Sequence, residues 1–493
     1  MFRTHSLLVA VLVLGVIHPT AVQAQLVDLR SVPVASGDQF LIYPSQRLGM
    51  GSPSIALTDR WQDPFVNPAK GAALTESAFF VSPTFYGISG DNGGGKTLPL
   101  AVLFTGSDWF GGGTVAIQQI ENREQQTSVI FWDRMMCCWP QPQPQRLDEG
   151  AARNVYLHTL AGRRLNESVA FGASLAYASI GAVDGVDLLY QGSDGVDESG
   201  HLVDARVGLS GKDSRDGDFE LLLLYHRLDM RHDIRYIEWR WIEEEMRTEL
   251  FVRDQTEWDD SRSWGVHGAY DRPIAAEGWR AGGLLTVNRK DHPKIPNYAL
   301  QNIPRDPGES WAFEMGMGLS KSTGPLQVGL DVVLEPIWSQ TWSVLDSTVV
   351  RPDSSHLKPG DNELENEFFF RNVHIRFGIG RDAERWGVQL GLLANSYGYE
   401  LEQFNNVDRS RRQQDESWME WTPTWGANIR FPEVEVRYSG RLATGTGLPG
   451  VDFVGARAKS FAGADFIVAP SGPLTLQDVH VLTHQITVSL PIR

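Results

Sequence analysis

The sequence predicts an all-β protein: a closed antiparallel transmembrane β-barrel of 14 to 16 strands with an N-terminal plug segment. Three observations support this fold. Many segments alternate apolar and polar residues with a period of two, a secretion signal precedes them, and short turns alternate with long polar links. The expected divisions are a signal peptide over 1–24, a plug segment over 25–75 and an outer-membrane β-barrel over 76–493.

The last segment of the chain, Val481–Ile492, shows the alternation most clearly. Leu482 and Ile486 fall on its apolar face, whereas Thr483 and Thr487 fall on its polar face. We expect this strand to close the barrel by pairing with the first strand.

Energetic cost decides which face meets lipid. A lysine or arginine that faces lipid at the midplane costs about 2–4 kcal/mol, so charged faces belong in a wet lumen. A soluble β-sandwich also alternates, but the strands here span about 10–15 residues, against the usual ~5–6 of soluble sheets. The residues predicted to line the lumen have mixed signs and should form ion pairs. They are Arg206, Glu314, Asp331, Arg376, Glu420, Arg430, Glu433, Glu435, Arg437 and Arg441.

The first 24 residues have the composition of a cleaved signal peptide. Arg3 precedes the apolar run Leu7–Ile17, and Val22 and Ala24 place small residues before a cut at Gln25. An uncleaved anchor is the alternative. Export places the protein in the outer membrane, with lipid and the barrel assembly machinery as partners. The balance of 44 Lys+Arg against 61 Asp+Glu gives a net charge of −17, which argues against a nucleic-acid partner.

Turn lengths give an independent indication of a barrel, because bacterial barrels have short periplasmic turns and long outer loops. The region from Asn154 to the end predicts 13 strands, and 76–134 supplies one to four more. An even total of 14 or 16 follows if both chain ends are periplasmic. Short turns are expected near 164–167, 211–218, 271–278, 322–324, 381–384 and 430–433, and long links near 181–200, 231–260, 291–308, 340–365, 401–416 and 445–477.

Tryptophans cluster towards the predicted strand ends, which is typical of interfacial girdles. They include Trp264, Trp279, Trp311, Trp338, Trp386, Trp418, Trp421 and Trp425.

Two stretches suggest ligand chemistry, but simpler interpretations fit them better. Gly90–Thr97 matches the phosphate-loop pattern, yet a strand-like run containing Pro99 follows where a helix is needed, so a hairpin loop is expected. Arg231–Asp260 is rich in carboxylates that could hold Ca²⁺ in an outer loop, but it lacks EF-hand spacing. We expect a solvated extension of two strands there.

The sequence predicts no enzyme, no metal site and no cofactor. No G-x-S-x-G motif or zinc-binding histidine pattern occurs. Cys137 and Cys138 are adjacent, so an ordinary disulfide between them would be strained, and we expect them in a loop.

The N-terminal run resembles the start of FadL-like outer-membrane transporters of hydrophobic compounds, and of the related type IX secretion shuttle barrels. The resemblance covers roughly residues 48–88 and rests on Gly49, Gly51 and the triplet Asn67, Pro68 and Ala69. It implies a plug inside a 14-stranded barrel, with these five residues as the gate. The chain ends in Pro491-Ile492-Arg493 rather than in a terminal aromatic residue, which departs from many barrels.

The resemblance implies passive transport of hydrophobic small molecules across the outer membrane. The alternative is a barrel that does not transport, acting in secretion or as a scaffold that binds partners through its long acidic loops. An outer-membrane hydrolase is disfavoured, because no spacing of a nucleophile and its base is visible.

Overall fold

The computed structural model describes most of the chain. The described residues are 26, 30, 33, 35–90, 92–121, 151–184, 195–242, 246–274, 277–291, 308–345, 347–447 and 479–492. The predicted signal peptide over 1–24 and the pair Cys137 and Cys138 lie outside these residues.

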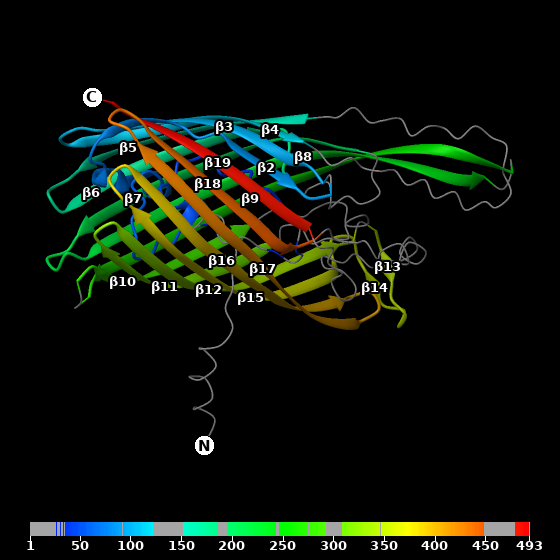
Figure 1. The fold of residues 1–493 in the computed structure, drawn as a ribbon. Coiled ribbons are helices and arrows are strands. Elements are labelled where there is room, and N and C mark those ends of the chain that lie inside the picture. The colour runs from blue at the N-terminus through cyan, green and yellow to red at the C-terminus, as the bar shows by residue number, and fades with distance from the viewer. Residues whose placement is uncertain are drawn as a thin grey trace, which may run out of the picture.

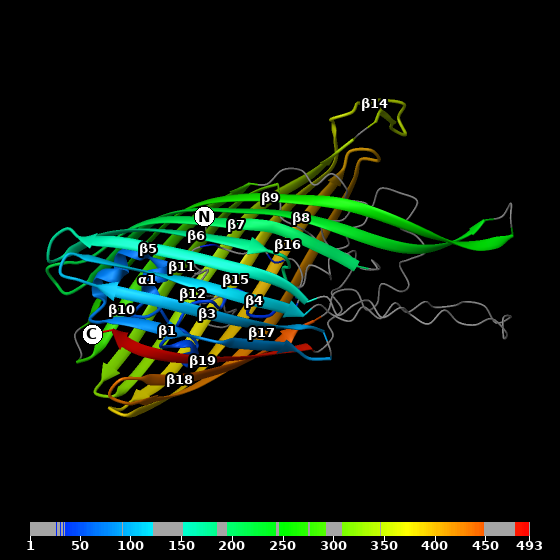
Figure 2. The same cartoon turned by 90° about the horizontal axis from the view of Figure 1, so that it is seen from above.

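The strands form one antiparallel sheet that closes into a barrel (Figures 1 and 2). β1 (Ser77–Val81) and β2 (Thr84–Ile88) both pair with β3 and β19 in unbroken register, so they form one strand interrupted at Ser82 and Pro83. The barrel therefore has 16 strands, within the expected range and two more than the family resemblance implies.

The remaining wall strands follow in chain order, each paired with the next. They are β3 (Gly94–Thr105), β4 (Trp109–Glu121), β5 (Ala151–Arg164), β6 (Val169–Ile180), β7 (Gly195–Lys212), β8 (Asp218–Ile242), β9 (Arg247–Pro273), β10 (Trp279–Asp291), β11 (Glu309–Thr323), β12 (Leu326–Val344), β15 (Asn362–Asp382), β16 (Trp386–Asn405), β17 (Ser410–Arg430), β18 (Glu435–Thr446) and β19 (Val479–Ile492). A small hairpin of β13 (Val349–Val350) and β14 (His356–Leu357) lies in the link between β12 and β15.

Closure occurs where the sequence predicts it. β19 pairs with the first strand, with Phe80 opposite Ser489 and Thr84 opposite Gln485. Thirteen strands follow residue 150, as expected, and three precede it. The further strand considered over 127–133 lies outside the described residues.

Turns and long links segregate to opposite ends of the barrel (Figure 1). The short turns, together with the end of β19, define the short-turn end; the other is the long-loop end. The short turns are 106–108, 165–168, 213–217, 274–278, 324–325, 383–385 and 431–434. At the long-loop end, five connections are long and three have only four or five residues, after β2, β8 and β16. The long link expected near 401–416 is therefore wrong, because β16 and β17 continue to Asn405 and from Ser410. Outer-membrane barrels have short periplasmic turns and longer outer loops.

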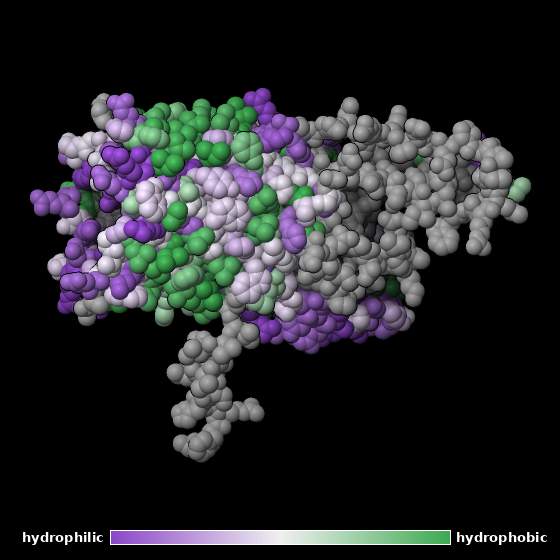
Figure 3. Space-filling view, viewed as in Figure 1, coloured by the Kyte–Doolittle hydropathy of each residue, from purple (hydrophilic) through white to green (hydrophobic). Residues whose placement is uncertain are grey.

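Apolar side chains cover the outside of the barrel and polar side chains face its inside. In β19, Leu482 and Ile486 are exposed on the outer face, whereas Thr483 and Thr487 are buried in the interior. Figure 3 shows hydrophobic patches along the wall and hydrophilic residues gathered at the short-turn end. The chain is thus a transmembrane barrel whose apolar outer surface contacts lipid.

Among the described residues, no helix is both long and apolar enough to cross a bilayer.

β8 and β9 extend far beyond their neighbours as a two-stranded ribbon (Figure 1). β7 stops opposite Arg235 and β10 stops opposite Arg262, but β8 and β9 stay paired as far as Ile242 and Arg247. This confirms the extension of two strands expected over 231–260.

The segment before the barrel, residues 35–76, lies inside it. It contains three short helices, η2 (Leu48–Met50), α1 (Asp63–Val66) and η3 (Pro68–Ala73). Pro64 and Pro68 stand in the first turns of α1 and η3, where proline costs no hydrogen bond. We call this stretch the N-terminal segment.

Candidate functional site

The turns of the N-terminal segment are organised by one buried carboxylate, Asp59. Its Oδ2 accepts hydrogen bonds from the Ser45 hydroxyl at 2.7 Å and from the backbone N–H groups of Gln46 and Arg47. Its Oδ1 accepts hydrogen bonds from the backbone N–H groups of Trp61 at 3.1 Å and of Gln62 at 3.2 Å. Since a buried carboxylate must be satisfied, these bonds hold the turns of the segment together as a compact unit.

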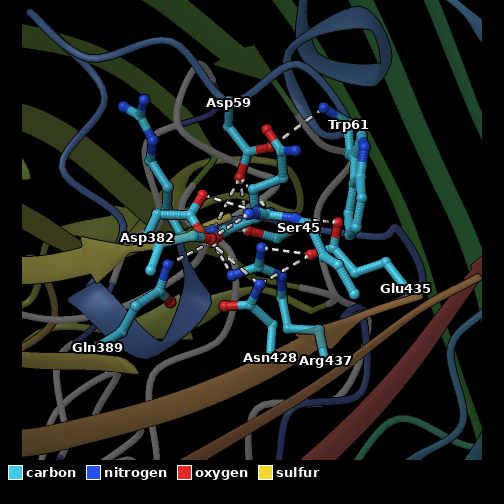
Figure 4. Close-up of polar contacts among 12 residues, drawn as sticks. Ser45, Asp59, Trp61, Asp382, Gln389, Asn428, Glu435 and Arg437 are labelled. Carbon is cyan, nitrogen blue, oxygen red and sulfur yellow. Dashed lines mark hydrogen bonds and ion pairs between the residues drawn. The ribbon is translucent and has the colours of Figure 1, made fainter. Parts of the chain in front are cut away.

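One face of this unit is bound by the wall strands β16 to β18 (Figure 4). The Gln46 carbonyl accepts from Gln389 Nε2 at 2.7 Å and from Arg437 Nη1 at 2.9 Å. The Arg437 guanidinium also lies over the Trp61 ring, 5.4 Å from its centroid. A predicted lumen residue, Arg437, therefore holds the segment directly.

Three of the predicted lumen residues meet at the short-turn end. Glu435 accepts from Arg437 at 2.7 Å and from Arg430 at 3.0 Å, and Arg430 also pairs with Asp382 at 2.7 Å. Glu433 lies exposed in the turn 431–434, between the end of β17 and the start of β18. The sequence pattern predicted that this strand begins two residues earlier than it does.

Gly49 and Gly51 are positions that only glycine fits well. A Cβ on Gly49 would lie 2.7 Å from the Cα of Gly426 in β17, and the Gly49 carbonyl accepts from Thr424 at 3.0 Å. Gly51 ends η2 with φ +70, in the left-handed region. Met50 between them lies on Gly378, where an added Cβ would overlap the Met50 carbonyl oxygen. Backbone thus packs directly on backbone.

Asp331 and Arg376 bind the next turn of the segment. Asp331 Oδ2 accepts from the backbone N–H groups of Ser54 at 2.6 Å and Ile55 at 3.2 Å. Arg376, opposite Asp331 in the sheet, lies 3.3 Å from the Ser54 hydroxyl. The register therefore places a charged pair under this turn, where the N–H groups need an acceptor.

The Asn67-Pro68-Ala69 triplet packs on the opposite wall. Asn67 is fully buried; its Oδ1 caps the Ala69 N–H at 3.1 Å and its amide donates to Glu220 in β8 at 2.9 Å. A Cβ on Gly172 of β6 would come within 2.5 Å of Pro68. The triplet is therefore a tight docking contact between segment and wall.

Lys70 and Asp63 add charge to this contact. Lys70 Nζ lies 2.8 Å from Glu220 and 3.8 Å from Asp63. Burial raises the pKa of Asp63 to about 7, although the Lys70 ammonium lowers it and Asp59 raises it further. Burial lowers the pKa of Lys70, but the carboxylates of Asp63 and Glu220 outweigh it and hold that pKa above its usual value.

A polar row runs from Glu220 across the inner wall. His267 Nε2 lies 3.8 Å from Glu220, and its Nδ1 lies 2.8 Å from the Thr286 hydroxyl. The Thr286 hydroxyl donates to Glu314 at 2.7 Å. Glu314, a predicted lumen residue, is therefore linked to the N-terminal segment through three neighbouring strands.

Glu420 lies in a different environment, nearer the long-loop end. It is fully buried, 3.3 Å from the Trp418 indole nitrogen and 3.9 Å from Arg30. Trp418 was expected in an outer girdle, but it faces the lumen and stacks on Tyr397 at 5.1 Å. An inward aromatic cluster surrounds it. Its members are Ala312, Ile337, Phe368, Phe370, Tyr397, Tyr399, Leu401 and Trp418.

A second apolar region is a pocket between the N-terminal segment and strands β5 to β8. We call it the lumen pocket. Tyr43 and Phe65 of the segment stack at 4.6 Å, and the wall residue His158 lies edge-on to both. The remaining lining includes Phe40, Ile42, Tyr156, Ala178 and Leu202, with Asp204, Arg206 and His226 at a polar margin.

The polar margin of the lumen pocket is itself paired. Arg206 binds Asp204 through two nitrogens, at 2.7 and 3.1 Å, and donates to the Val66 carbonyl at 3.0 Å. His158 Nδ1 is buried with no hydrogen-bond partner in the part of the chain that the structure describes. It is a polar atom without a hydrogen-bond partner on the apolar side of the pocket.

Other sequence motifs are placed as expected. Lys96 and Thr97 of the phosphate-loop match lie on β3, with no helix after them, and Lys96 pairs with Glu121. Across the described ranges, no group of three or more His, Cys, Asp or Glu side chains could hold a metal ion.

Sequence reasoning missed Asp59, Glu220, the wall glycines and the apolar linings. Some of the linings could have been found from the alternation of the strand, since Phe368 and Phe370 lie an even number of positions from Arg376, a predicted lumen residue, and so share its face. The glycines gave no such signal, because glycine has no apolar or polar character to alternate.

Comparison with known proteins yields remote similarity in structure. No family model and no curated protein matches the sequence. The solved structures that resemble it include the CymD monoaromatic hydrocarbon channel, at 11% identity over 94% of this chain and 98% of that one, with a TM-score of 0.41. A Pseudomonas aeruginosa FadL homologue aligns at 10% identity over 93% and 100% of the chains, with a TM-score of 0.45.

Proposed function

We propose that this barrel lets hydrophobic small molecules cross the outer membrane passively, with the N-terminal segment as the gate. In this proposal residues 1–24 are a cleaved export signal, 25–75 are the plug and 76–493 are the barrel. The gate is kept docked by the five plug residues Gly49, Gly51, Asn67, Pro68 and Ala69. The charged residues that line the lumen bind it to the wall.

The lumen pocket is the observation that carries the proposal. Polar residues are the rule inside a transmembrane barrel, so an aromatic pocket there requires another reason. Small-molecule sites are mostly apolar with few polar groups, and the lining of this pocket has that character. Because Tyr43 and Phe65 belong to the N-terminal segment, release of that segment would also open the pocket.

Filling the lumen pocket tests its role. Ala178→Phe places a ring in the pocket from β6, whereas Ala173→Phe places the same ring on the lipid-facing side of the same strand. We expect the first to weaken binding of naphthalene to the detergent-solubilised barrel by about tenfold or more, and the second to leave it unchanged. Equal affinity in both variants would count against a transport pocket.

The gate is tested by deletion of residues 26–70. The proposal expects faster entry of radiolabelled naphthalene into cells that carry the truncated barrel, at equal amounts of folded protein. Unchanged uptake would remove the gating role.

A second candidate function is a scaffold that binds a protein partner outside the cell. The β8–β9 ribbon favours it, because it exposes Leu250, Val252 and Trp258 on a stem where Arg235 pairs with Asp254. Shortening the ribbon should abolish partner capture and leave naphthalene uptake intact if this function holds.

A further inference from the structure

Cations on the outer surface of the barrel at the short-turn end lie on tryptophan rings. Each pair joins two neighbouring strands. The three strand pairs, β4–β5, β10–β11 and β15–β16, are distributed around the wall. The pairs are Arg163 on Trp109 at 5.4 Å, Lys321 on Trp279 at 5.2 Å and Arg381 on Trp386 at 5.4 Å, measured from the cationic centre to the ring centroid.

The three cations stand at the boundary of the lipid-facing band. Lys321 follows the outward residue Leu319 by two positions, and Arg381 follows the outward Ile379 by two. Since outward residues alternate, both cations point to the same side as the apolar wall. Tryptophan rings prefer the level of the lipid headgroups, so each pair marks that level.

These cations have no carboxylate partner within 4.0 Å among the described residues, which distinguishes them from three outward cations of the long-loop end. These three, unlike Arg153 at the same end, each have an acidic neighbour that neutralises them. Lys96 pairs with Glu121, Arg289 lies 3.2 Å from Asp291, and Arg371 lies 2.8 Å from Glu400.

We propose that the short-turn end binds the phosphate groups of anionic phospholipids through Arg163, Lys321 and Arg381. The uncompensated positive charge supplies the attraction, and an arginine fork fits two phosphate oxygens at once. The stacked indole holds each cation at headgroup depth and supplies an apolar surface for the first acyl carbons. This lipid contact is independent of the transport proposal, because it lies on the outer face.

Spin-labelled lipids measure this preference directly. Wild-type protein is reconstituted in phosphatidylcholine vesicles that contain a trace of spin-labelled phosphatidylglycerol or phosphatidylcholine. We expect the immobilised fraction to favour phosphatidylglycerol by about threefold or more at low salt, and the preference to fall with added salt.

Matched variants locate the preference. A triple variant with Arg163→Gln, Lys321→Gln and Arg381→Gln should lose it, and a control with Lys96→Gln, Arg289→Gln and Arg371→Gln at the other end should keep it. Folding of each is checked by heat-modifiable gel mobility.

Three results would overturn the assignment. They are equal immobilisation of the two lipids by wild-type protein, an equal loss in the control variant, and removal of the preference by inorganic phosphate at matched ionic strength. The last would identify a free phosphate site rather than a lipid site.

Discussion

The two halves of the lumen are lined by inward side chains of the same strands, but these side chains differ in chemistry. Near the short-turn end, carboxylates, arginines and bare glycine backbone hold the N-terminal segment, as at Asp331 and Gly378. Towards the long-loop end, the same face of β15 and β16 presents Phe370 and Tyr399. Alternation assigns a residue to the inner face, but its depth along the strand decides whether it holds the segment or forms an apolar lining.

The largest effect is expected from a substitution that disrupts a glycine contact in the short-turn half. Gly378→Ala adds a Cβ that overlaps the Met50 carbonyl, and backbone cannot move aside cheaply. We expect residues 45–60 to lose their amide-exchange protection while the barrel still folds. Gly398→Ala is the control, since its Cβ would meet nothing closer than 3.6 Å. Retained protection in the first variant would show that the segment is not held by this contact.

Removal of Asp59 should have the next largest effect. Asp59→Ala leaves several buried N–H groups without an acceptor, at a cost of about 1.5–3 kcal/mol for a bond to a charged group. We expect protection of residues 45–62 to fall, and Asp59→Asn to recover part of it through its one remaining oxygen. Hydrogen exchange followed by mass spectrometry measures both. Unchanged exchange in Asp59→Ala would contradict the role of this carboxylate.

A change in the long-loop half should affect ligands and not docking. Phe370→Ser replaces an inward ring of the aromatic cluster, and Phe377→Ser replaces an outward ring on the same strand. The first should lower naphthalene uptake severalfold with no change in the protection of residues 45–60. If Phe377→Ser lowers uptake equally, the lining has no special role.

The last expected effect is on the pH dependence of docking. The docked segment raises the pKa of Asp63 from its ordinary 3.8 to about 7, so the docked state binds a proton that the released state has lost between these values. Docking should therefore be strongest at low pH, weaken from about pH 4 to 7, and level off above. Protection factors, which are corrected for intrinsic exchange, should show this slope. Asp63→Asn should flatten it, and an unchanged slope in that variant would assign it to another group.

Much of the architecture followed from local pattern. The 13 strands after residue 150, the short turns and the pairing of β19 with β1 and β2 were all expected, because a period of two and a turn signal need only a few neighbouring residues. The strand total of 16 lay within the expected range, although the family resemblance implied 14.

The candidate site was less predictable. Arg376 and Asp331 were expected to line the lumen, and they do lie inside, but what they bind is a turn more than 270 residues earlier in the chain. Glu433 was placed on the inner face by parity and lies instead in a turn, because parity does not show where a strand begins. The expectation for Trp418 was wrong for a different reason. An aromatic residue near a strand end can face either the lipid or the lumen.

Taken alone, the sequence determined which face of each strand meets lipid, since a shift of one residue would turn the row of outward apolar side chains inward and the charged row towards the bilayer. Only the tertiary structure decided what fills the lumen at each depth. That choice depends on contacts such as Gly49 on Gly426 and Asn67 on Glu220, between residues too far apart in the chain for any local period to couple them.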